Sequence, residues 1–351
     1  MLGWIRRHWR LSLCVYIAAL ALTLFIDWAH SESRSMNMSK RYIDWYDATW
    51  LDINAENLTH SRDRIFPYPV VNRGDPDDPR PPVVLLHGTP GAGFPLDDIA
   101  LSLAQDGRRA IWFDLPGFAS QATLLYTDYS ADSYSKVVFA VLDDLGIERA
   151  HVVGWSNGGA VALRMAERDE DRLASITLLG SVGAQETEGS GNYVFEHGKY
   201  TVGYALLVWG AKVVPHFGIL GPPQERVAFL RNFDDTDQRP LAGIMQNLRT
   251  PTLILHGRDD FLVADWAAEY HHELIPNSTL VMTGDDHFMP FLAAGETAGH
   301  IAAFVERFDD PAAAAERSTV DLAPRVKPFG EAGDAALHWL HFAPVLIVLP
   351  L

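Results

Sequence analysis

Residues 150–162 read Ala-His-Val-Val-Gly-Trp-Ser-Asn-Gly-Gly-Ala-Val-Ala, and the prediction of this protein's architecture starts there. An apolar, β-branched run meets Gly154-Trp155-Ser156-Asn157-Gly158, and small apolar residues follow at helical spacing. This pattern predicts a strand, a sharp turn and a helix. Glycines on both sides of the serine suit a chain that doubles back tightly, and Gly159 would let the helix pack close to the strand. Ser156, whose hydroxyl such a turn holds clear of the backbone, is therefore a candidate nucleophile.

Strand and helix patterns alternate on either side of this turn. Buried strands are predicted over 82–86, 109–113, 173–179, 251–257 and 279–282, and helices over 97–105, 130–145, 264–273 and 295–308. An alternating stretch within 64–72 predicts an early edge strand. Strands that alternate with helices at this spacing predict an α/β fold with a mostly parallel sheet and helices on both faces.

The alternation stops before residue 250. The interrupting segment contains an apolar helical stretch over 204–214, a break at Gly221-Pro222-Pro223 and a polar helix that begins at Gln224. We predict a helical cap inserted between core strands, although these helices could instead cover an edge of the sheet. The predicted divisions are a first part of the core over 61–183, the cap over 184–249 and a second part of the core over 250–309.

Composition and charge exclude several classes of protein. A hydrophobic content of 48% in 351 residues excludes a disordered chain. A formal charge of −17 argues against a nucleic-acid surface, which needs basic patches. Cys14 is the single cysteine, so a disulfide framework and a thiolate metal site are both excluded. The sequence shows no cluster of His, Cys and Glu at metal-ligand spacing, and we predict no metal and no cofactor.

Residues 1–30 predict a membrane segment. Arginines at 6, 7 and 10 precede the uncharged, mostly apolar stretch 11–26. The stretch is slightly shorter than a spanning helix and slightly longer than the core of a signal peptide. Because Ala29-His30-Ser31 is a poor cleavage site, we favour an uncleaved anchor. The alternative is a cleaved signal peptide and a secreted protein. The arginines would keep the N-terminus in the cytoplasm and place the folded domain on the non-cytoplasmic side of the membrane.

Three further segments lie outside the predicted core. Residues 31–60 are polar with scattered aromatics and predict a linker that leads into the folded domain, and residues 310–334 predict a second linker. The tail 335–351 is very apolar and contains Pro344 and Pro350. It could dock on the protein, lie in a membrane interface or span the membrane, and the prolines disfavour spanning.

Ser156 needs two partners, because a serine hydroxyl attacks only when a base takes its proton and a third group orients that base. Of the fourteen histidines, His287 is the one that follows a late strand in a loop, so we predict it as the base. The acid should leave the preceding strand, where Asp259 and Asp260 stand side by side. Asp260 is favoured, with Asp259 as the alternative. The order Ser156, Asp260, His287 is the one expected of a triad on this topology.

The oxyanion formed during acyl transfer needs two backbone N–H donors. Asn157, at the positive end of the predicted helix, should supply one of them. Thr89 should supply the other, because the glycines and the proline of His87-Gly88-Thr89-Pro90-Gly91 let that loop fold close to the substrate. The residues predicted to bind the substrate are Gly88, Trp155 and Phe288.

The region from about Pro81 to Phe308 resembles the α/β-hydrolase superfamily, in its serine-nucleophile branch with an inserted helical cap. The motifs that carry the resemblance are His87-Gly88-Thr89-Pro90-Gly91, Asp114-Leu115-Pro116-Gly117, Gly154 to Gly158, Gly257 to Asp260, and His287. The resemblance implies an eight-stranded sheet, a catalytic triad and substrate entry between cap and core. Two residues depart from the family pattern. Ala119 stands where relatives often carry glycine, and Asp286 adds a carboxylate that could compete with Asp260 for His287.

Together these residues predict a membrane-associated serine hydrolase that cleaves a carboxylic ester through an acyl-enzyme intermediate. The apolar run Leu206-Leu207-Val208-Trp209 in the cap favours a lipophilic acyl chain. A carbon–carbon bond hydrolase and a non-catalytic binding protein on the same fold are alternatives. So is a prolyl-aminopeptidase-like enzyme, because the loop at 87–91 is similar to that of such enzymes and cap glutamates could meet an ammonium group; these are Glu186, Glu188, Glu196 and Glu225. The expected partners are a small-molecule ester and a membrane, with no nucleic acid, and the sequence does not indicate an oligomeric state.

Overall fold

The computed structural model describes residues 8–54, 65–121, 128–220 and 223–309. Within these ranges eight strands form one sheet, in the order β1-β2-β4-β3-β5-β6-β7-β8. The strands are β1 (Thr49–Asn54), β2 (Ile65–Arg73), β3 (Val83–Leu86), β4 (Ala110–Phe113), β5 (Ala150–Trp155), β6 (Leu173–Leu179), β7 (Thr252–Gly257) and β8 (Ser278–Thr283). Strands β3 to β8 pair in parallel, whereas β2 runs antiparallel to both of its neighbours, β1 and β4. The predicted mostly parallel, eight-stranded sheet is confirmed.

The parallel strands end at a common edge of the sheet. Every residue of β3 to β7 is buried, as the continuous apolar runs predict for strands covered on both faces. The register aligns the last residues of neighbouring strands, since Trp155 pairs with Leu179 and Gly257 pairs with Thr283. The residues that follow β5, β7 and β8 therefore emerge at the same edge of the sheet, where ligands bind in open α/β sheets.

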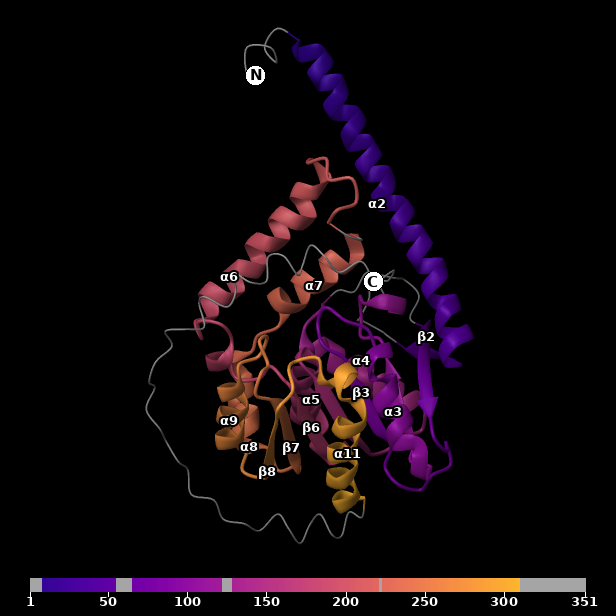
Figure 1. Ribbon diagram of the computed structural model, residues 1–351, viewed down its shortest axis with the longest axis vertical. Helices are drawn as coiled ribbons and strands as arrows, with labels where there is room; N and C mark the ends of the chain where they lie inside the picture. Colours follow the sequence, from indigo (N-terminus) through magenta and orange to yellow (C-terminus); the bar gives the residue numbers. More distant parts are fainter. Residues whose placement is uncertain (1–7, 55–64, 122–127, 221–222, 310–351) are drawn as a thin grey trace.

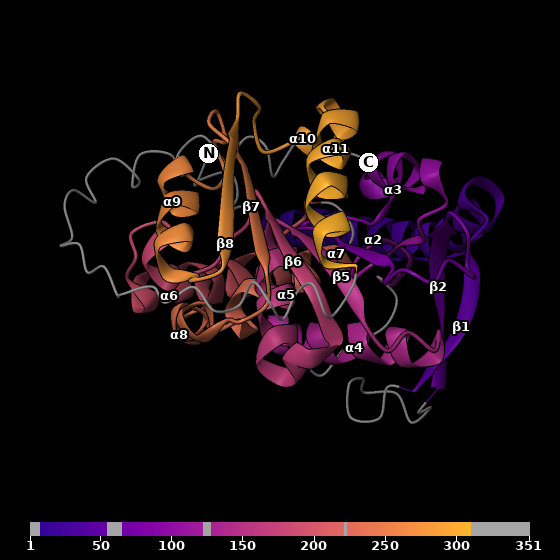
Figure 2. The same cartoon turned by 90° about the horizontal axis from the view of Figure 1, so that it is seen from below.

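Helices cover both faces of the sheet (Figure 2). Helices α3 (Asp97–Leu103) and α11 (Ala294–Val305) bury their apolar residues in a cluster on one face, with Trp112 and Leu255 of the sheet. Helices α4 (Ala131–Asp144) and α5 (Asn157–Asp169) do the same on the other face. Helix α4 begins at Ser130, whose hydroxyl accepts a hydrogen bond from the Ser133 N–H at 3.1 Å and so satisfies one of the free amides of the first turn.

The segment between β6 and β7 is helical. It contains α6 (Tyr193–Tyr204), η6 (Ala205–Trp209), η7 (Gly210–Lys212), α7 (Pro223–Asp235) and α8 (Arg239–Asn247). Helices α6 and α7 project above the carboxyl edge of the sheet (Figure 1) and stack Tyr200 on Phe233 with ring centroids 4.5 Å apart. Helix α8, which the sequence analysis did not anticipate, packs against α5 and α9 (Asp265–Leu274) and so lies in the core layer.

The prediction that residues 31–60 form a linker is wrong for most of that segment. Helix α2 runs without a break from Trp9 to Tyr46, because residues 31–46 contain neither glycine nor proline to end it. Strand β1 follows and pairs with β2 at the edge of the sheet. The predicted linker over 310–334 and the apolar tail over 335–351 lie outside the described residues.

The first half of α2 is long and apolar enough to cross a membrane. In the part of the chain that the structure describes, Trp9–Ala29 is the one stretch that meets both conditions, with 21 residues and a mean hydropathy of 2.0. Only 11% of this stretch is buried in the protein, which leaves most of its apolar side chains uncovered. The helix projects well beyond the core at its N-terminal end (Figure 1).

Candidate active site

Ser156 occupies the sharp turn between β5 and α5. Its backbone torsions, φ 54° and ψ −121°, are strained for a residue with a side chain. The turn leaves no room for side chains beside it, since a Cβ on Gly154 would lie 2.4 Å from the Gly158 carbonyl oxygen and one on Gly158 equally close to that of Leu86. On the helix side, a Cβ on Gly159 would collide with the side chain of Ser181.

Asp260 and His287 form a buried pair at the same edge of the sheet. The Asp260 Oδ2 atom lies 2.8 Å from His287 Nδ1, and both residues are buried. The other carboxylate oxygen, Oδ1, accepts hydrogen bonds from the backbone N–H groups of Leu262 (2.9 Å) and Val263 (2.8 Å), which fixes its orientation. Gly180, which follows the strand beside β5, faces the pair, because a Cβ there would lie 3.2 Å from Asp260 Oδ2.

The other polar side chains near this pair differ in their surroundings. Asp259 is exposed, and the carboxylate of Asp286 accepts a hydrogen bond from the Phe288 N–H at 2.7 Å. The ring of His256 bonds the backbone, as predicted, with Nε2 2.9 Å from the Val263 carbonyl oxygen. Burial lowers the pKa of His256, which keeps it neutral beside the Asp260–His287 pair. The structure thus brings Asp260, and not Asp259, to His287.

His87 ties the loop after β3 to the loop after β4. Its Nε2 accepts a hydrogen bond from the Leu115 N–H at 2.8 Å, so Nδ1 carries the proton and donates a hydrogen bond to the Gly88 carbonyl oxygen at 2.7 Å. Burial lowers the pKa of His87, in keeping with this neutral tautomer. Gly88 lies directly over the serine, since a Cβ there would be 2.7 Å from that of Ser156.

Asn157 links this loop to the inserted helices. Its side-chain amide donates to Thr89 Oγ1 at 3.2 Å and to Asn232 Oδ1, on α7, at 2.5 Å. Asn232 is itself fixed, because its amide donates to the Tyr129 carbonyl oxygen at 2.6 Å. Thr89 and Asn157, the two residues predicted to hold an oxyanion, are therefore neighbours. The role of Asn232 was missed, and a single asparagine in a polar helix carries no pattern that would reveal it.

Aromatic side chains surround His287. The indole N–H of Trp155 donates to the His287 carbonyl oxygen at 3.0 Å, and the indole is buried. Trp155 therefore lies behind the histidine and supports it, whereas the prediction had assigned this residue to substrate binding. Phe288, which is half-buried, packs near Phe261 and Phe291, and these two rings remain exposed at the surface beside the site.

Comparisons with known proteins agree with this fold. A family described as alpha/beta hydrolase fold matches residues 81–207. The chain belongs to the α/β-hydrolase superfamily. A relative of this hydrolase, a 2-hydroxymuconate semialdehyde hydrolase from Pseudomonas putida, is 28% identical over 228 residues, which cover 58% of this chain and 79% of that protein.

Two solved structures share the fold of this hydrolase. A thermophilic esterase from Thermogutta terrifontis aligns with a TM-score of 0.56 and 18% identity, covering 75% of this chain and all of that one. A bromoperoxidase from Bacillus anthracis aligns with a TM-score of 0.54 and 21% identity, covering 74% of this chain and 99% of that one. Identities this low show the common architecture, and the chemistry has to be argued from the site itself.

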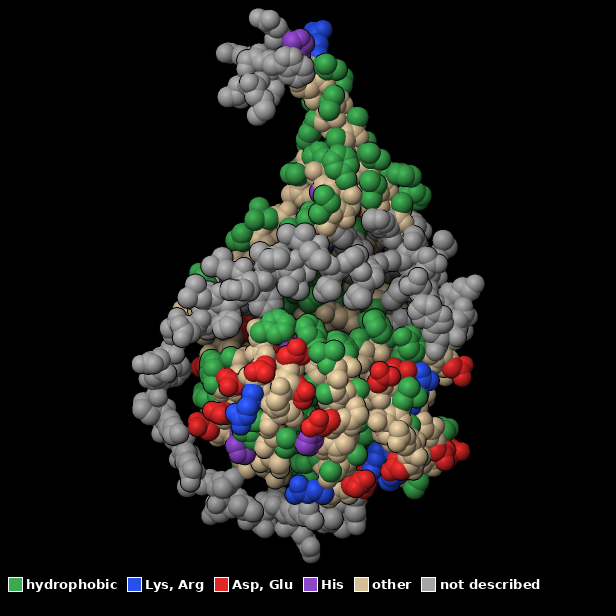
Figure 3. Space-filling model, in the orientation of Figure 1, with side chains coloured by type: hydrophobic (Ala, Val, Ile, Leu, Met, Phe, Trp, Pro, Cys, Tyr) green, Lys and Arg blue, Asp and Glu red, His purple; other side chains and the backbone are tan. Residues whose placement is uncertain are grey.

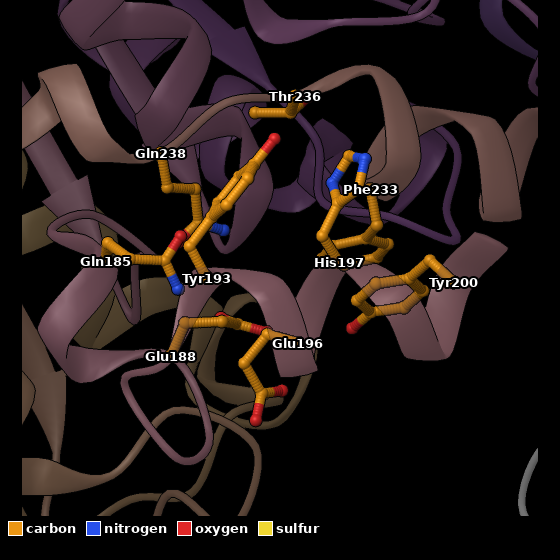
Figure 4. A pocket seen from close by; sticks show the side chains of 9 residues that line it. All are labelled: Gln185, Glu188, Tyr193, Glu196, His197, Tyr200, Phe233, Thr236 and Gln238. Atoms are coloured by element: carbon orange, nitrogen blue, oxygen red, sulfur yellow. The ribbon is translucent and has the colours of Figure 1, made fainter.

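A small polar pocket lies among the inserted helices of the hydrolase (Figure 4). It is lined by Gln185, Glu188, Tyr193, Glu196, His197, Tyr200, Phe233, Thr236 and Gln238. Burial and the nearby charge of Glu196 raise the pKa of Glu188 to about 7. Glu196 is already paired with Lys199 and accepts hydrogen bonds from the backbone N–H (2.9 Å) and hydroxyl (2.7 Å) of Ser190. Its charge is therefore compensated from within the protein.

Within the described residues, no group of three or more His, Cys, Asp and Glu side chains could hold a metal ion. The polar groups that the site offers are the Ser156 hydroxyl, the Asp260–His287 pair and the backbone around Thr89 and Asn157. These groups suit nucleophilic attack on a carbonyl, followed by proton transfer.

Proposed function

We propose that this hydrolase uses Ser156 as its nucleophile and cleaves a carboxylic ester. The observation that carries the proposal is the buried Asp260–His287 pair, 2.8 Å apart, at the sheet edge where Ser156 occupies a strained turn. A carboxylate on one ring nitrogen of a histidine, with a serine at the same edge of the sheet, is the arrangement of a charge-stabilised general base.

In the proposed mechanism, His287 Nδ1 donates a hydrogen bond to Asp260, which leaves Nε2 free to accept the hydroxyl proton of Ser156. Ser156 Oγ then attacks the ester carbonyl, and the imidazolium passes its proton to the departing alcohol. Asp260 stabilises that imidazolium without taking its proton. A water molecule, activated in the same way, releases the acyl group from the serine and restores the enzyme.

The backbone N–H groups of Asn157 and Thr89 would bind the oxyanion of the tetrahedral intermediate. Two contacts support this role. The side chain of Asn157 is bonded to both Thr89 and Asn232, so the two amides are held at a fixed separation before substrate arrives. Such preorganisation is what makes backbone donors effective, because the site does not have to reorganise as charge develops.

We further propose that α2 anchors the hydrolase in a membrane and is retained in the mature protein. Residues on both sides of the midpoint of the apolar stretch contact the inserted helices, with Tyr16 donating to the Val213 carbonyl oxygen and Asp27 bonded to Arg226 at 3.0 Å. Cleavage near Ala29 would remove both contacts. In this arrangement the three arginines hold the N-terminus in the cytoplasm, and the catalytic residues lie on the non-cytoplasmic side.

A carbon–carbon bond hydrolase is the second candidate. Its support is the relative named 2-hydroxymuconate semialdehyde hydrolase, which matches across most of its own length. The aminopeptidase alternative is weaker, because an ammonium group would compete with Lys199 for Glu196, and Glu188 carries only part of a charge near pH 7.

The test is a substrate panel with the full-length protein in detergent. It compares p-nitrophenyl esters of increasing acyl length, a prolyl p-nitroanilide and a ring-fission dienoate. We expect turnover of the esters, abolished in Ser156→Ala and kept in the control variant Ser102→Ala, which changes a serine on α3. Turnover of the dienoate alone would replace the ester assignment with the second candidate. Activity that survives in Ser156→Ala would overturn the proposed nucleophile.

A further inference from the structure

The end of the inserted segment carries an unusual density of exposed apolar side chains. We define the cap tip as residues 205–220, which contain η6, η7 and the turn that follows. Between Lys199 and Glu225 the sequence has a single charged residue, Lys212. Six large apolar side chains of the tip are each about half or more exposed, namely Leu206, Trp209, Val213, Val214, Phe217 and Ile219. An apolar patch of this kind on a water-soluble surface marks an interaction site.

The cap tip packs against the apolar half of α2 (Figure 1). The Thr23 hydroxyl oxygen accepts hydrogen bonds from the N–H groups of His216 (3.2 Å) and Phe217 (3.1 Å), and Thr23 is completely buried. The Tyr16 hydroxyl donates to the Val213 carbonyl oxygen. Both contact residues belong to the stretch that is long and apolar enough to span a membrane. The tip therefore lies beside the part of α2 that would be surrounded by lipid.

A charged cluster marks where this apolar zone ends. Asp27 is paired with Arg226 at 3.0 Å and with His216 at 3.4 Å, on the side of the tip that faces the core. Thr23 lies four residues before Asp27, about 6 Å further along the helix axis, and Tyr16 lies about 16 Å beyond Asp27. Since one leaflet of hydrocarbon is about 15 Å thick, the tip reaches about the depth of a single leaflet.

The backbone of the cap tip is suited to a medium without water. The N–H groups of Val213 and Val214 both donate to the Gly210 carbonyl oxygen at 3.0 Å, and that of Ile219 donates to His216 at the same distance. Thr23 accepts from two of the three N–H groups between Val214 and Ile219, those of His216 and Phe217. Irregular backbone at membrane depth is tolerated only where its polar groups are satisfied inside the protein.

From these observations we propose that the cap tip inserts into the acyl-chain region of the leaflet beside α2, so that the protein contacts the bilayer through two elements. The proposal rests on the anchoring role proposed for α2 and adds a second, cap-borne lipid contact. Lys212, whose ammonium lies 4.3 Å from the centre of the Trp209 ring, can extend its long chain towards the headgroups. Figure 3 shows the same division, with red and blue side chains over the core and green ones along α2 and the tip.

Lipid, and not a protein partner, covers the cap tip, because the exposed apolar surface of the tip is continuous with that of α2. The exposed face of the tip joins the exposed face of α2, where Leu22 and Phe25 are about half exposed. A protein partner seated on the tip would have to share this position with the lipid around α2, whereas the bilayer covers both surfaces at once. The apolar area removed from water adds to the affinity of the anchor.

The test places a fluorescent label at single cysteines of the full-length protein in phosphatidylcholine vesicles. Cys14 is first replaced by serine, which removes the one native thiol. An environment-sensitive label is then attached in separate variants, Ile219→Cys in the tip, Leu22→Cys in α2, and the control Leu101→Cys on the exposed side of α3. Doxyl-labelled lipid and aqueous iodide serve as the two quenchers.

We expect the label at 219 to emit at shorter wavelength and to be quenched by doxyl lipid as strongly as the label at 22, while iodide quenches only the label at 101. Iodide quenching at 219 together with lipid quenching at 22 would overturn the inference and leave the anchor intact. Iodide quenching at both positions would overturn the anchor and the inference together. Disulfide-linked dimers of the unlabelled Ile219→Cys variant, without lipid quenching of its labelled form, would show that a second copy covers the tip, which also overturns the inference.

Discussion

The side-chain amide of Asn157 lies 2.5 Å from the carbonyl oxygen of the Asn232 side chain, and this hydrogen bond joins the turn at Ser156 to the inserted helix α7. The same helix is bonded near its other end to α2, through Arg226 and Asp27. One rigid element therefore connects the proposed oxyanion site with the proposed membrane anchor. The position of Asn157 depends on a residue 75 positions away in sequence, in a segment whose helices the sequence predicts only coarsely.

Replacement of Asn232 by alanine tests this connection. The variant loses the contact to Asn157 and the hydrogen bond to the carbonyl oxygen of Tyr129. Misplacement of a catalytic group by about 1 Å can reduce turnover by about 100-fold, so we expect kcat to fall by about 10- to 100-fold while KM changes little. Steady-state kinetics on a short-chain ester measure both constants.

The matched control is Asn247→Ala, which removes an exposed asparagine on α8 that bonds only its own helix, at the Gly243 carbonyl oxygen. It should retain the activity of the unaltered protein. Equal losses of kcat in the two variants would show that Asn232 has no positioning role.

Asp309 stabilises the end of the described core. Its carboxylate holds the buried guanidinium of Arg108 through two hydrogen bonds, of 2.7 and 2.8 Å. We expect Asp309→Ala to lower the free energy of unfolding by about 2 kcal/mol, less than for a fully buried pair because the carboxylate is partly exposed. Urea unfolding at pH 7 measures this loss, and Asp171→Ala, at an exposed carboxylate, should leave stability unchanged.

This contribution of Asp309 should also depend on pH. Burial alone would raise the pKa of Asp309, but hydrogen bonds from Arg108 and His151 outweigh that effect and hold it well below the ordinary value of 3.8. A lowered pKa stabilises the folded state above the unfolded-state value, and the stabilisation is lost as the pH falls below it. The difference in stability between the two proteins should therefore shrink in acid, and a difference that grows would contradict this account.

Ala119 adopts a backbone conformation that suits glycine. Its φ of 40° lies in the left-handed region, which costs a residue with a Cβ roughly 1–2 kcal/mol. Glycine at position 119 would remove this cost, but its greater conformational freedom in the unfolded chain offsets part of the gain. We therefore expect Ala119→Gly to stabilise the protein by about 0.5–1 kcal/mol. Chemical denaturation measures the change. The comparison variant Ala140→Gly, inside helix α4, should destabilise by about 1 kcal/mol, and a similar loss in Ala119→Gly would refute the argument.

Glu188 should make the protein less stable as the pH rises. Its pKa is raised to about 7 by burial and by the charge of Glu196, from an ordinary value of 4.5. An acid with a raised pKa binds more protons in the folded state, so stability is greatest below the lower value and declines as the pH rises through the higher one. Glu188→Gln should remove this decline.

Thermal unfolding at pH 5 and pH 8 measures the effect of Glu188. The Tm of Glu188→Gln, relative to that of the unaltered protein, should be higher at pH 8 than at pH 5. Glu306→Gln, at an exposed carboxylate, should show no such trend. An equal difference at both pH values would mean that Glu188 is ionised throughout.

The sequence predicts the strands of the core well, because continuous apolar runs bounded by turns have one compatible position in a parallel sheet. It also predicts the turn at Ser156, where the spacing of glycines follows directly from the lack of room for a Cβ. Asp260 could be favoured over Asp259 but not fixed, since adjacent residues differ only in which way the loop turns them. In the structure the N–H groups of Leu262 and Val263 orient the carboxylate of Asp260, whose other oxygen contacts His287.

Contacts between distant segments could not be predicted. The extension of α2 beyond Ser31 is not recognisable from the sequence, because its polar residues lack the apolar periodicity by which a helix is recognised. Trp155 was expected to bind substrate, and its burial behind His287 depends on the packing of Phe291, which sequence alone does not place. The hydrogen bond between Asn157 and Asn232 depends on how the inserted helices pack against the core.

The central claim is that Ser156, Asp260 and His287 act as one unit, and the labelling of the protein by a fluorophosphonate probe tests it most directly. Peptide mass spectrometry should find the adduct on Ser156, with the labelling rate reduced about 10³- to 10⁴-fold in Asp260→Asn and unchanged in Asp259→Asn. An adduct on another serine, or a rate that is the same in Asp260→Asn as in the unaltered protein, would contradict the account.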